Sequence, residues 1–245
     1  MKPLALVVAL IALFSAHPAL AAERSLEFGR FGKVALYGAG RAPAEVVLFV
    51  SGDGGWNQGV VSMARNLADL GALVVGIDIR RYLASLAGGH EACSYPAGDF
   101  ELLSKFVQKT LDLPDYLVPI LAGYSSGATL VYAVLAQSPE STFKGALSLG
   151  FCPDLPVVRP FCRGSGLASK PLTKGKGFLF EPSAALPAPW IALQGQVDQV
   201  CGPGEVDRFG REARPAEVVP LPKVGHGFSV EKNWRPQSPT CCSAT

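Results

Sequence analysis

The chain has 245 residues, of which 49% are hydrophobic and 17% are charged, and its formal net charge at pH 7 is +2. This near-neutral balance argues against a nucleic-acid-binding protein, because such proteins carry a marked excess of Lys and Arg. The length suits one domain of ordinary size.

The N-terminus has the pattern of a secretory signal peptide. Lys2 precedes an almost wholly apolar run over residues 4–14, and Ala19-Leu20-Ala21 supplies the small residues of a cleavage site. The apolar run is too short to span a bilayer comfortably. We therefore predict that residues 1–21 are removed, that residues 22–245 form a single domain, and that this domain works in the periplasm.

Strand-like and helix-like segments then alternate along the chain. Residues 34–37, 46–50 and 72–79 predict strands, and residues 58–70 and 99–111 predict helices. The strands are continuously apolar, as expected when both faces of a sheet are buried. Together the segments predict an α/β architecture in which helices cover both faces of a mostly parallel sheet.

The sequence Gly123-Tyr124-Ser125-Ser126-Gly127 is the most informative motif of the chain. It matches G-x-S-x-G and lies between a predicted short strand at residues 116–122 and a small-residue helix at residues 128–136. A serine on so tight a strand-to-helix turn is exposed at the edge of the sheet, and its small neighbours prevent clashes between strand and helix. We interpret Ser125 as a nucleophile.

The regular alternation is interrupted after a strand predicted at residues 145–150. Residues 152–189 are rich in Pro, Gly, Ser and Lys and show little periodicity. We expect them to form an insertion that covers the active site as a cap. Two more strands follow, and the chain after Phe228 is short and polar, without the amphipathic helix that normally ends such a sheet.

A nucleophilic serine needs a base, and the chain has three histidines. His17 lies in the predicted signal peptide, and His90 follows two glycines in a loop, where we favour a surface or structural role. His226 lies on a Gly-flanked loop after the last predicted strand. From there it can reach across the edge of the sheet, so we predict that His226 is the base.

The acid that orients the histidine is predicted to be Asp198, which ends a strand and turn beginning at Trp190. The chain order Ser, Asp, His is that of α/β-hydrolases. Asp154, Glu205 and Asp207 are competing acids, but Asp198 has the tightest strand–turn–acid context.

Residues 51–56, with the sequence SGDGGW, predict an oxyanion hole. A Gly-rich turn after a strand leaves backbone N–H groups exposed. One donor would be the amide of Asp53 or Gly54, and the other the amide of Ser126. The Asp53 carboxylate would repel an oxyanion, so we expect it to hold the loop or to meet a cationic group of the substrate. No dinucleotide or phosphate-loop motif is present, and we expect no cofactor.

All six cysteines follow the predicted cleavage site: Cys93, Cys152, Cys162, Cys201, Cys241 and Cys242. An even number in an exported chain favours disulfides. Metal binding is the alternative, but no C-x-x-C motif is present and His is scarce, so we expect no metal. Cys152 and Cys201 follow strands that should be neighbours, so one bond between those loops fits. Cys241 and Cys242 lie in a polar tail and could pair elsewhere or with another chain.

Beyond the general hydrolase pattern, the chain resembles the VirJ family, which also forms the C-terminal part of the longer AcvB proteins. The resemblance runs from about residue 46 to residue 228. It rests on residues 51–56, Gly76-Ile77-Asp78 with Arg81-Tyr82, Gly123-Tyr124-Ser125 with Gly127-Ala128, Asp198 with Cys201 close behind, and Gly225-His226 with Phe228.

This resemblance implies a periplasmic serine esterase that hydrolyses aminoacyl-phosphatidylglycerol, such as the lysyl or alanyl lipid. It implies that Ser125 is the nucleophile, His226 the base and Asp198 the orienting acid. It also marks Arg81 and Tyr82 as candidates for substrate binding.

A lipid substrate of this kind carries an ammonium and a phosphate, and the sequence offers partners for both. Asp53 could meet the ammonium. The cations of the insertion could face the phosphate and the membrane surface; they are Arg159, Arg163, Lys170, Lys174 and Lys176.

Two other functions stay open. One is a general periplasmic esterase or thioesterase acting on soluble acyl esters. The other is a non-catalytic partner of a type IV secretion or envelope complex, since some VirJ-like proteins are linked to secretion and virulence. The intact Ser, Asp and His argue against the second.

Overall fold

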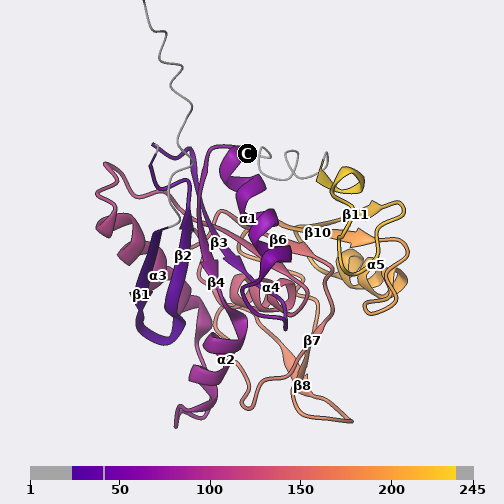
Figure 1. Cartoon of the computed structure of the whole chain (residues 1–245). Coiled ribbons are helices and arrows are strands. Elements are labelled where there is room, and N and C mark those ends of the chain that lie inside the picture. Colours follow the sequence, from indigo (N-terminus) through magenta and orange to yellow (C-terminus); the bar gives the residue numbers. More distant parts are fainter. Residues whose placement is uncertain (1–23, 41, 236–245) are drawn as a thin grey trace, which may run out of the picture.

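The computed structural model describes residues 24–40 and 42–235, so the predicted signal peptide, Cys241 and Cys242 lie outside the described residues. An eight-stranded sheet forms the centre, in the order β1-β2-β4-β3-β5-β6-β10-β11 (Figure 1). Its strands are β1 (Arg24–Phe28), β2 (Gly32–Tyr37), β3 (Glu45–Val50), β4 (Ala72–Ile77), β5 (Ile120–Tyr124), β6 (Gly145–Leu149), β10 (Trp190–Gly195) and β11 (Ala216–Leu221).

The sheet is mostly parallel, as predicted. Only the pairs β1–β2 and β2–β4 are antiparallel, and every pair from β4 to β11 is parallel. Parallel strands need crossover connections, which the helices supply. The helices are η1 (Gly29–Phe31), α1 (Gln58–Asp69), α2 (Ile79–Ala87), α3 (Pro96–Thr110), α4 (Ser126–Gln137), α5 (Pro203–Glu212) and η2 (Glu231–Asn233).

Successive residues of β3 show how the two faces are covered. Val46, Leu48 and Val50 pack in the cluster that holds the buried residues of α2, α3, α4 and α5. Val47 and Phe49 point the other way and pack with α1. A strand buried on both faces therefore needs apolar residues throughout, which explains the continuous apolar run in the sequence.

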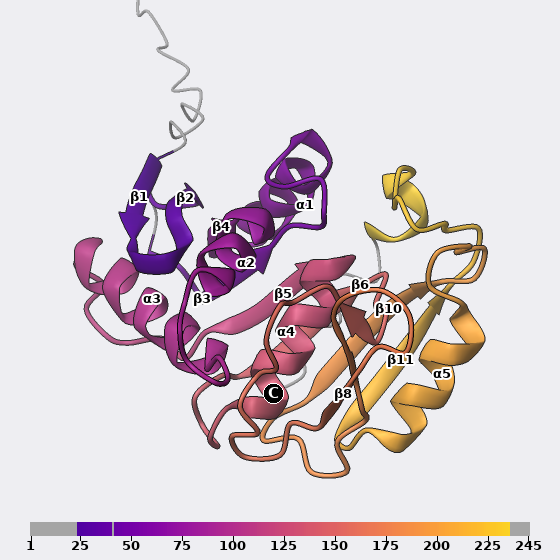
Figure 2. The same ribbon diagram turned by 90° about the horizontal axis from the view of Figure 1, so that it is seen from below.

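The C-terminal segment covers part of the α1 face. Phe228 and Trp234 are buried in the same cluster as α1, and the indole N–H of Trp234 donates to the Phe228 carbonyl at 2.8 Å. Figure 2 shows this segment in yellow on the same side of the sheet as α1, with α4 and α5 on the other side. Two large side chains thus cover apolar sheet surface on the α1 side.

The predicted bounds of two strands differ from the structure for identifiable local reasons. The strand predicted at residues 72–79 ends at Ile77, because Asp78 caps α2: its Oδ1 accepts from the amides of Arg80 at 2.9 Å and Arg81 at 3.3 Å. The strand predicted at residues 116–122 begins only at Ile120.

The late start of β5 has a local cause. The backbone N–H and C=O of Leu117 both bond to the side-chain amide of Gln108 rather than to a neighbouring strand. Pro119 has no N–H to give to a ladder. The chain therefore joins the sheet only after the proline.

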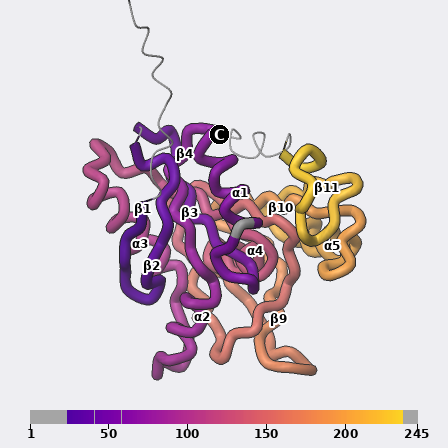
Figure 3. The backbone as a smooth tube through the Cα atoms, viewed as in Figure 1, coloured from indigo at the N-terminus to yellow at the C-terminus, as the bar shows by residue number. Residues whose placement is uncertain are grey.

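The insertion at residues 152–189 carries a small antiparallel sheet of β7 (Asp154–Leu155), β9 (Phe178–Phe180) and β8 (Ser169–Pro171). Figure 3 traces its orange loops at the lower edge of the view. The Tyr132 hydroxyl of α4 donates to the Glu181 carbonyl at 3.1 Å, and Arg159 donates to the Leu86 carbonyl of α2 at 3.2 Å. These contacts place the insertion against helices. Among the described residues, no hydrogen bond or ion pair joins residues 153–189 to Ser125 or His226.

None of the described helices has both the length and the apolar character needed to cross a membrane.

Candidate active site

Three predicted site residues follow strands whose carboxyl ends share one edge of the sheet. Ser125 follows β5, Asp198 follows β10 and His226 follows β11. β5, β6, β10 and β11 are successive neighbours and all parallel. Ligand and catalytic sites of open α/β sheets lie at this edge.

Ser125 stands on a strained turn between β5 and α4. Its φ of 54° and ψ of −123° lie in a region that L-residues rarely adopt. A side chain on Gly123 would strike the Gly127 carbonyl, and one on Gly127 would strike the carbonyls of Val50 and Ser51. The two glycines of the motif are therefore required for strand and helix to meet at this angle.

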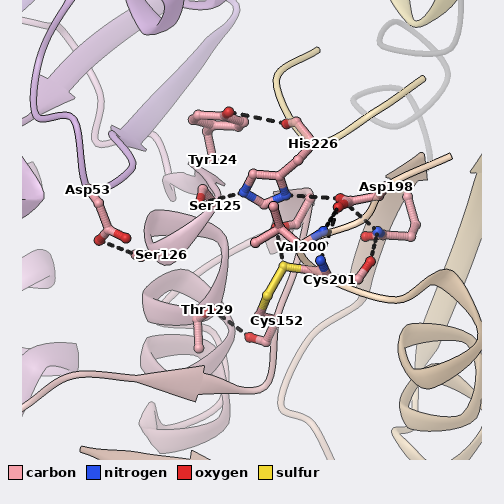
Figure 4. Close-up of a disulfide and its surroundings, with 12 residues drawn as sticks. Asp53, Tyr124, Ser125, Ser126, Thr129, Cys152, Asp198, Val200, Cys201 and His226 are labelled. Atoms are coloured by element: carbon pink, nitrogen blue, oxygen red, sulfur yellow. Dashed lines mark hydrogen bonds and ion pairs between the residues drawn. A yellow bond between two sulfur atoms is a disulfide. The ribbon is translucent and has the colours of Figure 1, made fainter. Parts of the chain in front are cut away.

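The three side chains form a continuous hydrogen-bonded line (Figure 4). Ser125 Oγ lies 2.9 Å from His226 Nε2. His226 Nδ1 lies 2.9 Å from Asp198 Oδ2. These are the contacts that a serine nucleophile, its base and the orienting acid require.

Asp198 is the acid that reaches the imidazole. Its side chain is fully buried, at 0% exposure. The competing acids lie elsewhere: Asp154 is exposed on β7, Glu205 is in the first turn of α5, and Asp207 pairs with Arg211.

Tyr124 holds the loop that carries the base. Its hydroxyl donates to the His226 carbonyl at 3.1 Å, and its ring lies 5.8 Å from the imidazole, centroid to centroid. Burial raises the pKa of the Tyr124 hydroxyl, and the Asp198 charge raises it further, so the hydroxyl stays a donor. Sequence reasoning did not assign this residue a role, because the contact spans 102 positions.

The loop after β3 faces the start of α4. The described backbone hydrogen bonds include none donated by the amides of Asp53, Gly54 or Ser126, so these N–H groups are available to a ligand. Ser126 Oγ donates to Asp53 Oδ1 at 2.6 Å. The side chains of two of the three residues predicted to form the oxyanion hole are thus bonded to each other, which fixes the spacing of their backbones.

The remaining residues of the SGDGGW motif are anchored on β4 and α2. Asp78 Oδ2 accepts from the Trp56 amide at 3.1 Å, and Ser51 Oγ accepts from the Ile79 amide at 3.1 Å. The Trp56 ring lies directly over Gly76, where any side chain would collide with it. The Gly76-Ile77-Asp78 motif and the start of α2 therefore hold the SGDGGW loop in place.

Tyr82, predicted as a candidate for substrate binding, is 0% exposed, so its side chain is not open to a ligand in this structure. Its ring stacks on Phe31 at 4.6 Å, and its hydroxyl donates to Asp99 Oδ2 at 2.8 Å. Burial, followed by the Asp99 charge, raises the pKa of Tyr82 well above its usual value.

The side chain of Arg81, the other candidate, packs against Gly32 at the start of β2. The neighbouring Arg80 instead lies beside Gly55 in the SGDGGW loop. Helical geometry explains why Arg80 and not Arg81 lies beside this loop, because consecutive residues of α2 point in directions about 100° apart. Of the two, Arg80 is the cation near the site.

Two of the insertion cations are engaged away from the triad. Arg159 donates to the carbonyls of Leu86 and Ala87, and Lys170 pairs with Glu181 at 3.4 Å. Their predicted role in meeting a phosphate is therefore unsupported by their contacts.

Two disulfides join the described cysteines, Cys93–Cys162 and Cys152–Cys201. The second is the pairing that the strand order suggested. Asp198, Cys201 and His226 place potential metal-ligand atoms within 4.8 Å of one another. With Cys201 in a disulfide, its sulfur is no thiolate, and the other two side chains bond each other, so the group does not fit a metal.

Comparisons with known proteins agree with this description. Residues 44–149 match the family model described as bacterial virulence protein (VirJ), a stretch that includes the SGDGGW loop and the G-x-S-x-G turn. The family resemblance seen in the sequence is thereby confirmed over these residues. No curated protein matches the chain by sequence at a significant level.

Solved structures share the fold. An esterase domain from Rhodothermus marinus is 17% identical with a TM-score of 0.54, and the alignment covers 89% of this chain and 95% of that one. A dienelactone hydrolase from Anabaena variabilis is also 17% identical with a TM-score of 0.55, and the alignment covers 89% and 95%. XC6422 from Xanthomonas campestris, described as an α/β serine hydrolase without a lid, is 21% identical with a TM-score of 0.51, and the alignment covers 90% and 96%. The α/β-hydrolase fold predicted for the chain is confirmed.

Proposed function

We propose that this chain, whose residues 44–149 carry the VirJ family match, is a serine hydrolase of carboxylic esters. One observation carries the proposal: a continuous line of hydrogen bonds runs from buried Asp198 through His226 to Ser125 Oγ on a strained turn. Backbone strain of this kind persists where function requires it.

The geometry supports a two-step acyl transfer. Ser125 Oγ attacks the ester carbonyl while His226 Nε2 takes the hydroxyl proton, and Asp198 stabilises the imidazolium. The amide of Ser126 and that of Asp53 or Gly54 bind the developing oxyanion. His226 then gives the proton to the leaving alcohol, and a water molecule repeats the sequence to release the acid.

We further propose that the substrate is an aminoacyl ester of phosphatidylglycerol, as the family resemblance implies. Asp53 supports this choice, because it is an exposed carboxylate beside the proposed oxyanion site and could pair with the substrate ammonium. Arg80, next to Gly55, is better placed than the insertion cations to meet the phosphate.

A periplasmic location stays part of the proposal. Two disulfides fit an oxidising compartment outside the cytoplasm. Lipid headgroups of the inner membrane are within reach there, which would bring the protein into peripheral membrane contact.

The substrate proposal is tested by comparing lysyl- and alanyl-phosphatidylglycerol with their N-acetylated analogues in detergent micelles. We expect the purified protein to hydrolyse the free-amine lipids much faster, and Asp53→Asn to narrow that preference. Ser126→Ala is the control for the hydrogen bond: it removes the Ser126–Asp53 hydrogen bond but keeps the Asp53 charge, so it should slow both substrates equally. Equal wild-type rates on both lipids would remove ammonium recognition and leave a general esterase.

A strain test separates the enzyme from a binding partner of a secretion or envelope complex. Deletion of the gene and its replacement by Ser125→Ala should cause the same accumulation of aminoacylated lipid. If the Ser125→Ala strain behaves like the wild type in every assay, the protein acts by binding and the catalytic proposal fails.

A further inference from the structure

The acid of the triad is held by four hydrogen-bond donors. Asp198 Oδ1 accepts from the amides of Val200 at 2.8 Å and Cys201 at 3.0 Å. Asp198 Oδ2 accepts from Gln194 Nε2 at 3.1 Å and bonds the imidazole. With the side chain fully buried, its orientation is set by these donors rather than by water.

Cys201 takes part twice in this arrangement. Its amide bonds Asp198 Oδ1, and its carbonyl accepts from the same Gln194 Nε2 at 2.9 Å. A shift of the Cys201 backbone would therefore disturb both carboxylate oxygens, one directly and one through Gln194.

The Cys152–Cys201 disulfide ties this backbone to the helix of the nucleophile (Figure 4). Cys152 follows β6, and its carbonyl accepts from Thr129 Oγ1 at 2.6 Å. Thr129 lies one turn into α4, and its amide donates to the Ser125 carbonyl at 3.2 Å. The contacts thus close a ring: Ser125, Thr129, Cys152, Cys201, Asp198, His226 and back to Ser125.

We propose that the Cys152–Cys201 disulfide is a positioning element of the triad, which fixes Asp198 relative to Ser125 through Cys201 and Thr129. The role rests on the proposed function, because it acts through the same triad. The triad is then correctly arranged for catalysis only while Cys152 and Cys201 are joined in the disulfide.

The second disulfide is a matched control within the same chain. Cys93–Cys162 joins the loop before α3 to the insertion, where Ser94 and Phe161 form a bridge. It closes a separation of 69 residues against 49 for Cys152–Cys201, so its loss should cost at least as much stability in a chain-entropy account. The contacts named here for the Cys93–Cys162 disulfide include no residue of the ring of contacts that links Ser125, Cys152, Cys201 and His226.

The first experiment measures hydrolysis of p-nitrophenyl butyrate by Cys152→Ala/Cys201→Ala and by Cys93→Ala/Cys162→Ala. We expect kcat to fall on the order of 10²-fold with little change in KM for the first variant, because a misplacement near 1 Å suffices for such a loss. The second variant should keep the wild-type kcat. Equal loss of kcat in both variants would overturn the proposal.

A double-mutant cycle with Asp198→Asn separates positioning from general destabilisation. If the disulfide acts through Asp198, its removal should cost little more kcat in the Asp198→Asn background. A full, additive loss in that background would contradict the proposal. If the cysteine variant does not fold, Thr129→Val decides: it removes only the bond to Cys152 and should lower kcat, while an unchanged kcat would overturn the ring.

A spectroscopic readout keeps failure of this proposal distinct from failure of the proposed function. The His226 Nδ1 proton bonded to Asp198 should give a ¹H NMR signal far downfield of the amides, absent in Asp198→Asn. We expect Cys93→Ala/Cys162→Ala to keep this signal and Cys152→Ala/Cys201→Ala to shift or lose it. An unchanged signal would refute the positioning role even if the protein proved to have no esterase activity.

Discussion

Two polar networks of this molecule share their chemistry but differ in how they end. In one, Asp198 bonds His226, which bonds Ser125. In the other, Asp99 bonds the Tyr82 hydroxyl at 2.8 Å and Arg30 at 3.2 Å. Each places a carboxylate against a ring that carries a hydrogen-bonding group.

The difference lies in the last group of each line. The Asp198 network ends on Ser125 Oγ, at an edge where backbone amides are available to a ligand. The Asp99 network closes on Arg30, which also pairs with Glu91 at 3.4 Å. A hydrogen-bonded carboxylate therefore does not by itself indicate a catalytic site. The informative feature is a network that ends on a nucleophilic side chain beside backbone amides with no hydrogen-bond partner. The predictions below break each network in turn.

Loss of the nucleophile or base should have the largest effect. Ser125→Ala and His226→Ala should each lower kcat on the order of 10⁶-fold, because members of a triad act as a unit. The measurement is ester hydrolysis, with circular dichroism to show that the fold is kept. Residual activity near the wild-type level in either variant would contradict the assignment.

Substituting the two acids should separate the networks clearly. Asp198→Asn should lower kcat on the order of 10⁴-fold, because the amide disturbs the tautomer and orientation of His226. Asp99→Asn should keep kcat but lower the free energy of unfolding by about 1–3 kcal/mol. Asp154→Asn, at the competing acid, should change neither. A crippling Asp154→Asn with a mild Asp198→Asn would show that the wrong acid was chosen.

The two hydrogen-bonded tyrosines provide a smaller and closely matched comparison. Tyr124→Phe frees the His226 carbonyl and should lower kcat roughly fivefold, the value of about 1 kcal/mol. Tyr82→Phe removes a hydroxyl from the other network and should lower only the stability. Denaturant unfolding and kinetics on both variants test the pair, and a kcat loss in Tyr82→Phe alone would reverse the comparison.

The smallest expected effect concerns alkaline pH. The pKa of Tyr82 is raised above its ordinary value of 10.0, first by burial and then by Asp99. Above that ordinary value the unfolded chain loses the proton while the folded protein keeps it, so the free energy of unfolding falls as pH rises. Tyr82→Phe should make this decline shallower by at most about 1.4 kcal/mol per pH unit. Half-buried Tyr124 and buried Tyr132 also have raised pKa values, so the decline should not vanish. An identical slope in the variant would argue against a buried, neutral Tyr82.

Much of the fold follows from local sequence patterns. The apolar strands and the G-x-S-x-G turn are encoded by neighbouring residues, as the collisions at Gly123 and Gly127 show. The helices α2 and α5 were not predicted. α2 has only nine residues, and its cap Asp78 and first residue Ile79 lie in the run predicted as a strand, while α5 contains two glycines.

The site was predictable where the chain offers few choices. His226 stood out because only three histidines are present, and Asp198 because it ends a strand and turn between Ser125 and His226. The roles of Tyr124, Arg80 and Tyr82 depend on tertiary contacts, which no local pattern contains. Tyr82 in particular lies in a family motif yet is buried, so a motif marks a residue without saying what it does.

Covalent labelling by a fluorophosphonate tests the central claim most directly. The claim is that Ser125 is an activated nucleophile, since His226 can take its proton and two amides can hold the phosphonyl oxygen. Mass spectrometry of the treated wild-type protein should find one adduct, on the peptide that contains Ser125, and none in Ser125→Ala or His226→Ala. An unlabelled wild-type protein, or an adduct that persists in Ser125→Ala, would contradict the account.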